Sequence, residues 1–198
     1  MRKGFLTILV GFILLSCGDG NVKILVDPDI QLAIDSTEIA EYMEARGYTD
    51  FETTDLGVRY IILNEGTGTD IDESDIVTFD YNGMLTNDSI FDTSIKAVGD
   101  SIRNVENIPD KFTSTFTSTK AYSPFTITYT SSGWTVNGQF VPGFSDGIST
   151  TLNKMNVGGH ALVIMPSALG YGTASRGLLI PENSVLIFEF FPTEVTKQ

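Results

Sequence analysis

The chain has few of the side chains that most often carry catalysis. Its 198 residues include one cysteine, Cys17, and one histidine, His160. A single cysteine excludes a disulfide within the chain, and so few thiols and imidazoles exclude a Cys/His metal cluster. A Ser-His-Asp triad would have to use His160, which follows two glycines and is expected to be a solvated residue at a strand end. No glycine-rich phosphate loop with a lysine is present. We therefore expect neither a metal nor another cofactor.

Basic residues are also scarce. The sequence holds 12 Lys and Arg against 25 Asp and Glu, which gives a formal net charge of −13. Such an acidic body repels the phosphates of nucleic acids and of anionic lipid headgroups. Nucleic acid is therefore not an expected partner, and any attachment to a membrane must come from a lipid rather than from charge.

Residues 1–16 have the pattern of an export signal. Arg2 and Lys3 precede an apolar run, from Phe5 to Leu15, that is too short to span a bilayer. The ending Leu14-Leu15-Ser16-Cys17 resembles a bacterial lipobox, in which the signal is removed before a cysteine that carries a diacylglycerol. An ordinary signal peptide that happens to contain a cysteine is the alternative. We expect lipidation of Cys17, which would anchor an exported protein to the bacterial cell envelope, in the periplasm or at the outer membrane.

Composition and the spacing of apolar residues divide the rest of the chain into three segments. Residues 17–34 are expected to form a tether, residues 35–56 a helical extension, and residues 57–196 the main domain. Within that domain, residues 93–123 are rich in serine and threonine, which predicts an insertion that could hold an edge hairpin. In the extension, a helix is expected at residues 35–46. Asp35 would cap this helix, and its buried side would carry Ile39, Tyr42 and Met43.

From residue 57 onward, apolar and polar residues alternate as they do in half-buried strands. The expected strands are residues 58–62, 76–85, 90–92, 124–129, 160–166 and 184–191. One amphipathic helix is expected after Pro142, with Phe144, Ile148, Leu152 and Met155 on a single stripe. Many strands and one helix predict an α+β fold. We expect an antiparallel sheet of about five to six strands, curled around one short α-helix and preceded by a short N-terminal helix.

A long connection joins the last two expected strands. Residues 167–183 are too many for a structureless link inside a compact domain, where such loops are usually functional or disordered. The segment carries Tyr171 between two glycines and an apolar run from Leu178 to Pro181. So many apolar residues favour an ordered loop that folds over a site.

The chain has no recognisable set of catalytic charged residues, but it has several aromatic residues in the expected hairpins and loops. Most aromatic residues simply fill a core. Those in the hairpins and loops belong to an ordered set of segments that resembles the FKBP family of peptidyl-prolyl cis/trans isomerases, from about Gly57 to Val195. The segments are Tyr81-Asn82-Gly83-Met84-Leu85, Phe91-Asp92, Val141-Pro142-Gly143-Phe144, Val157-Gly158-Gly159, Ile164-Met165-Pro166, Tyr171-Gly172, Ile180-Pro181-Glu182-Asn183-Ser184 and Leu186-Ile187-Phe188. The helix before Gly57 and the lipid signal are similar to those of exported bacterial lipoprotein members.

The resemblance implies an FKBP-like fold and an isomerase that helps to fold exported or envelope proteins, with proline-containing polypeptides as clients. It implies catalytic roles for Tyr171, Asp92 and Phe91, with the Tyr171 hydroxyl donating a hydrogen bond to a substrate carbonyl. The implied substrate-binding residues are Tyr81, Phe125, Phe140, Val141, Phe144, Ile180 and Phe188. Phe144 would form the pocket floor, where many members have tryptophan.

Two other functions are compatible with the same residues. One is a catalytically weak chaperone or docking module on the same fold. The other is a surface lipoprotein whose insertion at residues 93–123 binds a specific partner. Macrolide binding in the prolyl pocket is a further possibility that the sequence leaves open.

Overall fold

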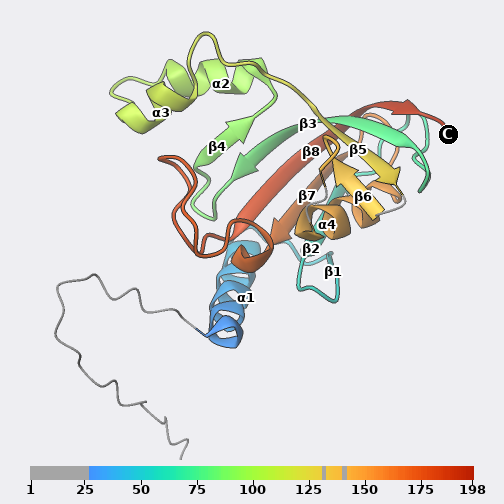
Figure 1. Ribbon diagram of the computed structural model, residues 1–198, viewed down its shortest axis with the longest axis horizontal. Helices are drawn as coiled ribbons and strands as arrows, with labels where there is room; N and C mark the ends of the chain where they lie inside the picture. The colour runs from blue at the N-terminus through green and yellow to red at the C-terminus, as the bar shows by residue number, and fades with distance from the viewer. Residues whose placement is uncertain (1–26, 131–132, 140–141) are drawn as a thin grey trace, which may run out of the picture.

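The structure is a computed structural model that describes residues 27–130, 133–139 and 142–198. A single antiparallel sheet of eight strands forms its centre (Figure 1). The strands are β1 (Glu52–Thr53), β2 (Arg59–Asn64), β3 (Ile76–Met84), β4 (Ile90–Thr93), β5 (Phe125–Thr130), β6 (Gly133–Val136), β7 (His160–Met165) and β8 (Leu186–Thr196). Their order is β1-β2-β7-β8-β3-β5-β6, and β4 pairs with β3.

Helix α4 (Pro142–Leu152) lies against the sheet and packs on β2, β6 and β7. Ile148 and Leu152 are buried on its inner side, and Met155 is buried just after its end, as the predicted stripe requires. Gly147 allows α4 to pack closely against the sheet. A Cβ at this position would lie 2.7 Å from Val58 Cγ1 and 2.8 Å from Val163 Cγ1. The curled sheet around this helix confirms the predicted α+β fold.

Strand β7 is almost entirely apolar because both of its faces are covered. Ala161, Val163 and Met165 belong to the main core, which also contains residues of α4. Leu162 and Ile164 alternate with them and pack in a second core cluster with helix α1 (Pro28–Ala45). The sheet therefore lies between α4 on one face and α1 on the other.

Helix α1 begins earlier than the sequence indicates. The predicted start was Asp35, but Asp27 is the N-cap and accepts a hydrogen bond from the Asp29 backbone N–H at 2.9 Å. Pro28 occupies the first helical turn, where its missing N–H costs nothing. Residues 28–34 are thus helical, although they were expected to belong to the tether. The predicted buried residues Ile39, Tyr42 and Met43 are all buried. No helix in the described part of the chain is both long enough and apolar enough to cross a bilayer.

Asp35 joins α1 to the loop that follows β7. Its carboxylate is fully buried, and Oδ2 accepts hydrogen bonds from the Ser167 backbone N–H at 2.8 Å and from Ser167 Oγ at 2.7 Å. Oδ1 accepts a third hydrogen bond from Gln31 Nε2 at 2.7 Å. The residue that was expected to cap the helix therefore fixes the first residue of the 167–183 loop.

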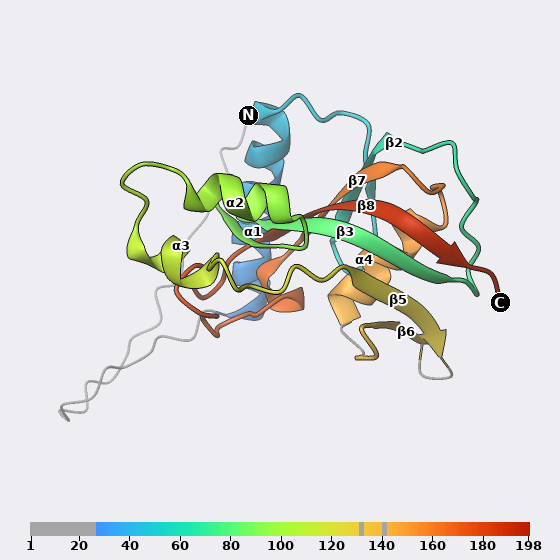
Figure 2. The same cartoon turned by 90° about the horizontal axis from the view of Figure 1, so that it is seen from above.

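The 93–123 insertion contains two short helices instead of an edge hairpin. These are α2 (Lys96–Arg103) and α3 (Asp110–Thr115), and Figure 2 shows both at the end of the sheet away from the C-terminus. In α2, Asp100 pairs with Lys96 at 2.5 Å and with Arg103 at 3.0 Å, spacings that favour a helix. The sheet also has more strands than the expected five to six, because β1 and β6 are too short to show a period.

Candidate functional site

Four neighbouring strands bring aromatic rings together at one end of the sheet. The Tyr81 ring stacks on Phe125, with centroids 3.8 Å apart and planes 4° apart. Phe91 meets Phe188 edge to face at 5.7 Å. Contacts of this kind contribute about 1 kcal/mol each beyond the burial of area. Gly83 makes room for the second pair, because a Cβ there would lie 2.5 Å from Phe91 Cε2 and 3.2 Å from Phe188 Cε1.

A break in strand pairing places two consecutive residues on the same side of β4. Asp92 is paired with Gly83 and Ile90 with Met84, so Phe91 has no partner on β3 and forms a β-bulge. Successive side chains of a regular strand point to opposite faces, and a bulge removes that alternation. Phe91 and Asp92 can therefore line one pocket together.

That pocket has a volume of about 450 Å³. Its apolar lining consists of Phe91, Phe125, Val136, Leu186 and Phe188. Asp92, Asn137, Gln139, Tyr171 and Arg176 add polar groups at its margin, together with Gly170. A mostly apolar hollow with a few convergent polar groups is the usual form of a ligand site.

The Asp92 carboxylate is held by three donors. Oδ2 accepts a hydrogen bond from the Tyr81 hydroxyl at 2.7 Å, and Oδ1 accepts one from the Thr93 backbone N–H at 2.9 Å. Lys120, from the insertion, also contacts Oδ1 at 2.7 Å. Burial, and next the hydrogen bond to Asp92, raises the pKa of Tyr81. Tyr81 is therefore a neutral donor, and its hydrogen bond to Asp92 holds the pocket wall in place.

Tyr171 stands at the margin of the pocket on an ordered loop. The loop starts with a 3₁₀ turn (Ser167–Leu169) and is closed by hydrogen bonds from Gly172 N to Ser167 O at 2.8 Å and from Asn183 N to Gly172 O at 2.6 Å. The Arg176 guanidinium lies 5.2 Å from the centroid of the Tyr171 ring. The Tyr171 side chain is 40% exposed, and its hydroxyl makes no hydrogen bond among the described residues. It can donate to a ligand that enters.

The structure brings most of the expected site residues together. Five of them, Phe91, Asp92, Phe125, Tyr171 and Phe188, line the pocket directly. Tyr81 lies behind Phe125 and supports the wall through its stacking and its hydrogen bond. Phe140 and Val141 lie outside the described residues, and for Phe144 the structure describes only its backbone position in α4.

Ile180 is not among the residues that line the described pocket. Its side chain is 7% exposed and packs in the main core, as that of Phe91 does, and its backbone pairs with Arg176. Sequence reasoning missed the six other lining residues. Of these, Arg176 gave a usable signal, since it is the single basic residue of the long loop.

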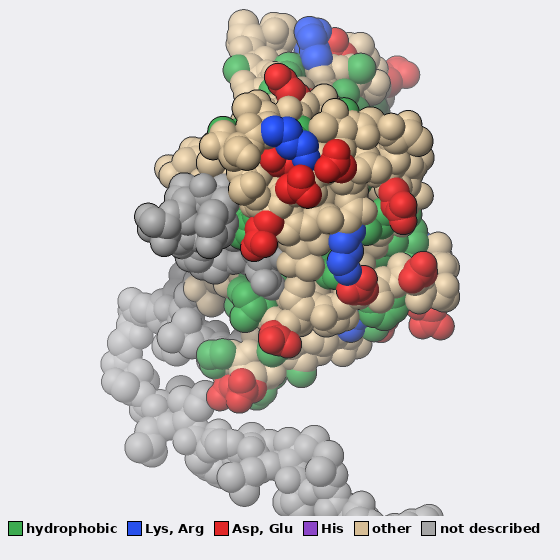
Figure 3. Space-filling model, turned by 90° about the vertical axis from the view of Figure 1, so that its right-hand side faces the viewer, with side chains coloured by type: hydrophobic (Ala, Val, Ile, Leu, Met, Phe, Trp, Pro, Cys, Tyr) green, Lys and Arg blue, Asp and Glu red, His purple; other side chains and the backbone are tan. Residues whose placement is uncertain are grey.

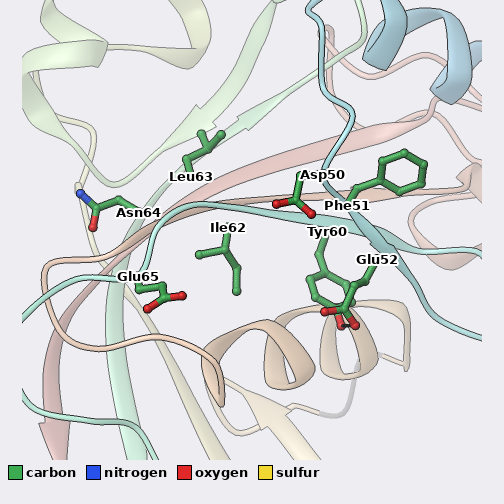
Figure 4. Close-up of a pocket in the computed structure, with 8 residues that line it drawn as sticks. All are labelled: Asp50, Phe51, Glu52, Tyr60, Ile62, Leu63, Asn64 and Glu65. Atoms are coloured by element: carbon green, nitrogen blue, oxygen red, sulfur yellow. Dashed lines mark hydrogen bonds between the residues drawn. The ribbon is translucent and has the colours of Figure 1, made fainter.

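A second hollow lies beside β2 and has a different character. Figure 4 shows Asp50, Glu52, Glu65 and Tyr60 among its lining residues. The Tyr60 hydroxyl donates to Glu52 at 2.6 Å, and Lys154 Nζ lies 2.5 Å from the other Glu52 oxygen. Phe51, Ile62 and Leu63 also line this hollow, but most of its exposed surface is polar, so it suits a prolyl ring poorly. The face in Figure 3 likewise carries more acidic than basic side chains, in keeping with the net charge.

An antiparallel half-barrel around one helix, with an aromatic pocket at its end, defines a small α+β binding domain of the immunophilin type. The sequence profile of the family described as FKBP-type peptidyl-prolyl cis-trans isomerase matches residues 68–190, and the chain belongs to that family. Those residues contain all the pocket-lining side chains named above.

Several bacterial proteins are similar to this chain. A protein of Haemophilus influenzae named "Probable FKBP-type peptidyl-prolyl cis-trans isomerase" is 28% identical over 140 residues, which is 71% of this chain and 43% of the relative. "Outer membrane protein MIP" of Legionella longbeachae is 28% identical over 141 residues, covering 71% of this chain and 45% of that protein. The chain therefore spans less than half the length of these two relatives. The crystal structure of FkpA from Escherichia coli has the same fold, with a TM-score of 0.51 and 23% identity over 85% of this chain and 62% of that one.

Proposed function

We propose that the protein is a peptidyl-prolyl cis/trans isomerase that assists the folding of proline-containing polypeptides in the cell envelope. The observation that carries the proposal is the pocket itself. Phe91, Phe125 and Phe188 form its apolar wall, and the Tyr171 hydroxyl stands at its margin. Family membership supports the same reaction.

The reaction needs no nucleophile. Rotation about a prolyl peptide bond faces a barrier of about 18–20 kcal/mol because the planar amide is stabilised by a charge-separated resonance form. An aromatic pocket removes the bond from water and disfavours that planar form relative to the twisted one. A hydrogen bond from Tyr171 to a flanking carbonyl would hold the twisted geometry. A rate gain of about 10⁵ requires only ~7 kcal/mol.

Refolding of a protein whose slow step is proline isomerisation tests the proposal. We expect the purified protein to accelerate that step at micromolar concentration or below. Phe91→Ala and Tyr171→Phe should each slow the catalysed reaction about tenfold, which corresponds to ~1.4 kcal/mol of transition-state stabilisation. Phe51→Ala is the matched control, because Phe51 is 41% exposed and lines the other hollow. If the protein binds a prolyl peptide without accelerating refolding, it is a docking module instead.

We also propose that the protein is exported and attached to the membrane by a lipid on Cys17. The apolar stretch before Cys17 and the name of the Legionella relative, an outer membrane protein, support this placement. Cys17→Ser should abolish incorporation of labelled palmitate and move the protein from the membrane fraction to the soluble fraction. A Cys17→Ser protein that still labels with palmitate or remains with the membrane would overturn the anchor.

A further inference from the structure

The 93–123 insertion forms an apolar groove of its own. A hollow of about 320 Å³ lies between α2, α3 and the turn that joins β3 to β4. Its apolar lining residues are Ile90, Ile102, Val105, Ile108, Pro109 and Phe112. None of these side chains is fully buried, and Val105 is 57% exposed. Apolar residues exposed singly are ordinary on a protein surface, whereas a cluster of six around one hollow indicates a surface that another molecule covers.

The groove and the prolyl pocket meet at neighbouring residues of β4. Ile90 lines the groove, and the next two residues, Phe91 and Asp92, line the pocket. The ion pair between Lys120 and Asp92 fixes the end of the insertion to the same strand. Figure 1 and Figure 2 both show α2 and α3 at the end of the sheet that carries β4. A molecule that occupies the pocket therefore lies close to the groove.

The charge of the insertion also differs from that of the rest of the chain. Residues 93–123 hold four Lys and Arg against three Asp and Glu, whereas the whole chain has about twice as many acidic as basic residues. A nearly neutral surface does not repel a polypeptide of either charge. Its apolar lining suits the aliphatic side chains that an unfolded polypeptide exposes.

We propose that this groove is a second binding site for the client polypeptide. It takes an aliphatic or aromatic side chain of the client while a prolyl residue of the same chain occupies the aromatic pocket. This inference rests on the proposed isomerase function and adds a substrate preference to it. An extended peptide advances about 3.4 Å per residue, so peptides with three to six residues between the proline and the apolar side chain sample spans of about 10–20 Å.

Peptides that differ at one position test the groove. Each peptide contains a single proline and one test position three to six residues away. The test position follows the proline in one series and precedes it in the other. At each spacing, a peptide with leucine at the test position is compared with one that has asparagine there. We expect one spacing at which leucine lowers KM about tenfold and leaves kcat unchanged, since a partly buried leucine contributes roughly that much. Val105→Asp should remove the advantage of leucine. The same variant should isomerise a short peptide with proline alone at the wild-type rate, which also shows that it is folded. Leu56→Asp is the matched control, because Leu56 is 47% exposed and lies outside both hollows.

The outcomes separate this inference from the function on which it rests. If the protein does not isomerise the short peptide, the proposed function is wrong and the inference falls with it. If the short peptide is isomerised but leucine gives no advantage at any spacing, the function stands and the groove is not a client site. The same conclusion follows if Val105→Asp keeps the advantage. If wild-type protein self-associates in sedimentation and Val105→Asp does not, the groove is an interface between copies of the chain, and the inference is overturned.

Discussion

Lys120 Nζ lies 2.7 Å from Asp92 Oδ1, although the two residues are 28 positions apart. The lysine belongs to the insertion, and the aspartate belongs to the pocket. The Tyr81 hydroxyl donates to Oδ2 and the Thr93 backbone N–H to Oδ1, so the lysine is a third donor and the one that carries a charge. The insertion thus supplies a side chain that helps to orient the pocket wall.

Lys120→Met is therefore expected to lower the proposed isomerase activity without unfolding the protein. The ion pair is partly exposed, with 20% of the lysine and 36% of the aspartate side chain accessible, so its contribution is about 0.5–1 kcal/mol. We expect kcat/KM for a short prolyl peptide to fall about two- to fivefold, and the deficit to shrink in high salt. Lys120→Arg should keep the wild-type rate, and so should Lys111→Met in the exposed part of α3. Equal rates for Lys120→Met and wild type at low salt would contradict this role.

The hydrogen bonds between Asp35 of α1 and Ser167, at the start of the 167–183 loop, are expected to contribute more to stability. Asp35 is fully buried, and removing its carboxylate leaves the Ser167 backbone N–H and hydroxyl without an acceptor. We expect Asp35→Ala to lower the free energy of unfolding by about 2–4 kcal/mol, measured by urea denaturation. Because Ser167 begins the loop that carries Tyr171, the variant should also lose isomerase activity while still folded. Glu41→Ala, at an exposed position of the same helix, is the control and should change neither quantity.

The acidic turn near residue 70 is closed by the C-terminal end of the chain. Lys197 Nζ lies 3.1 Å from Asp70, 2.8 Å from Asp72 and 3.0 Å from Asp75. Burial by itself would raise the pKa of Asp75. The Asp72 backbone N–H and the Lys197 ammonium outweigh burial and lower that pKa. The hydrogen bond to Asp72 is the main reason that the pKa of Lys197 is raised.

These shifts define a pH window for the cluster. A lowered carboxyl pKa gives stability that is present above the unfolded value of about 3.9 and is lost as the pH falls through the folded pKa. A raised ammonium pKa gives stability that is complete below about pH 10.4 and is lost as the pH rises through the folded pKa. Lys197→Met should therefore lower the urea midpoint at pH 7 and lower it less at pH 3, where the ion pairs begin to be lost. A midpoint difference of the same size at both values would contradict the role of the ion pairs.

The sequence predicts the fold well because its signals are local. The alternation in residues 58–62 and 76–85 and the stripe of Ile148 and Leu152 each show one period over several residues, and the structure has the corresponding elements. The aromatic residues could be assigned to one site only through their resemblance to a family, since burial in a core would leave the same pattern.

The features that the sequence missed depend on distant contacts or on very short elements. Asp35 was expected to cap helix α1, but its partner is Ser167, which is 132 residues away, and the helix begins at Pro28 after the N-cap Asp27. Helices α2 and α3 span eight and six residues, too few for a clear period in a segment rich in serine and threonine. The sequence around Phe91 carries no local signal of the β-bulge either, yet the bulge turns both Phe91 and Asp92 toward the pocket.

Gly83 is the position where the pocket should be most sensitive to a single methyl group. A Cβ there would approach Phe91 Cζ at 2.7 Å and Phe91 Cε2 at 2.5 Å, closer than carbon atoms can come without moving. We expect Gly83→Ala to lower the free energy of unfolding by about 1–3 kcal/mol through overpacking. Isomerase activity should fall by tenfold or more, because Phe91 is pushed into the space that a prolyl ring would occupy.

A compensating substitution tests whether the clash is with Phe91. Phe91→Leu is smaller at the point of contact, so the double variant Gly83→Ala/Phe91→Leu should be more stable than the sum of the two single changes predicts. Urea denaturation of the four proteins in the cycle measures this coupling, which is expected to be at least about 1 kcal/mol. Additive effects would show that the methyl group clashes elsewhere. The ring of Phe188, 3.2 Å from the same Cβ, would then be the next position to change.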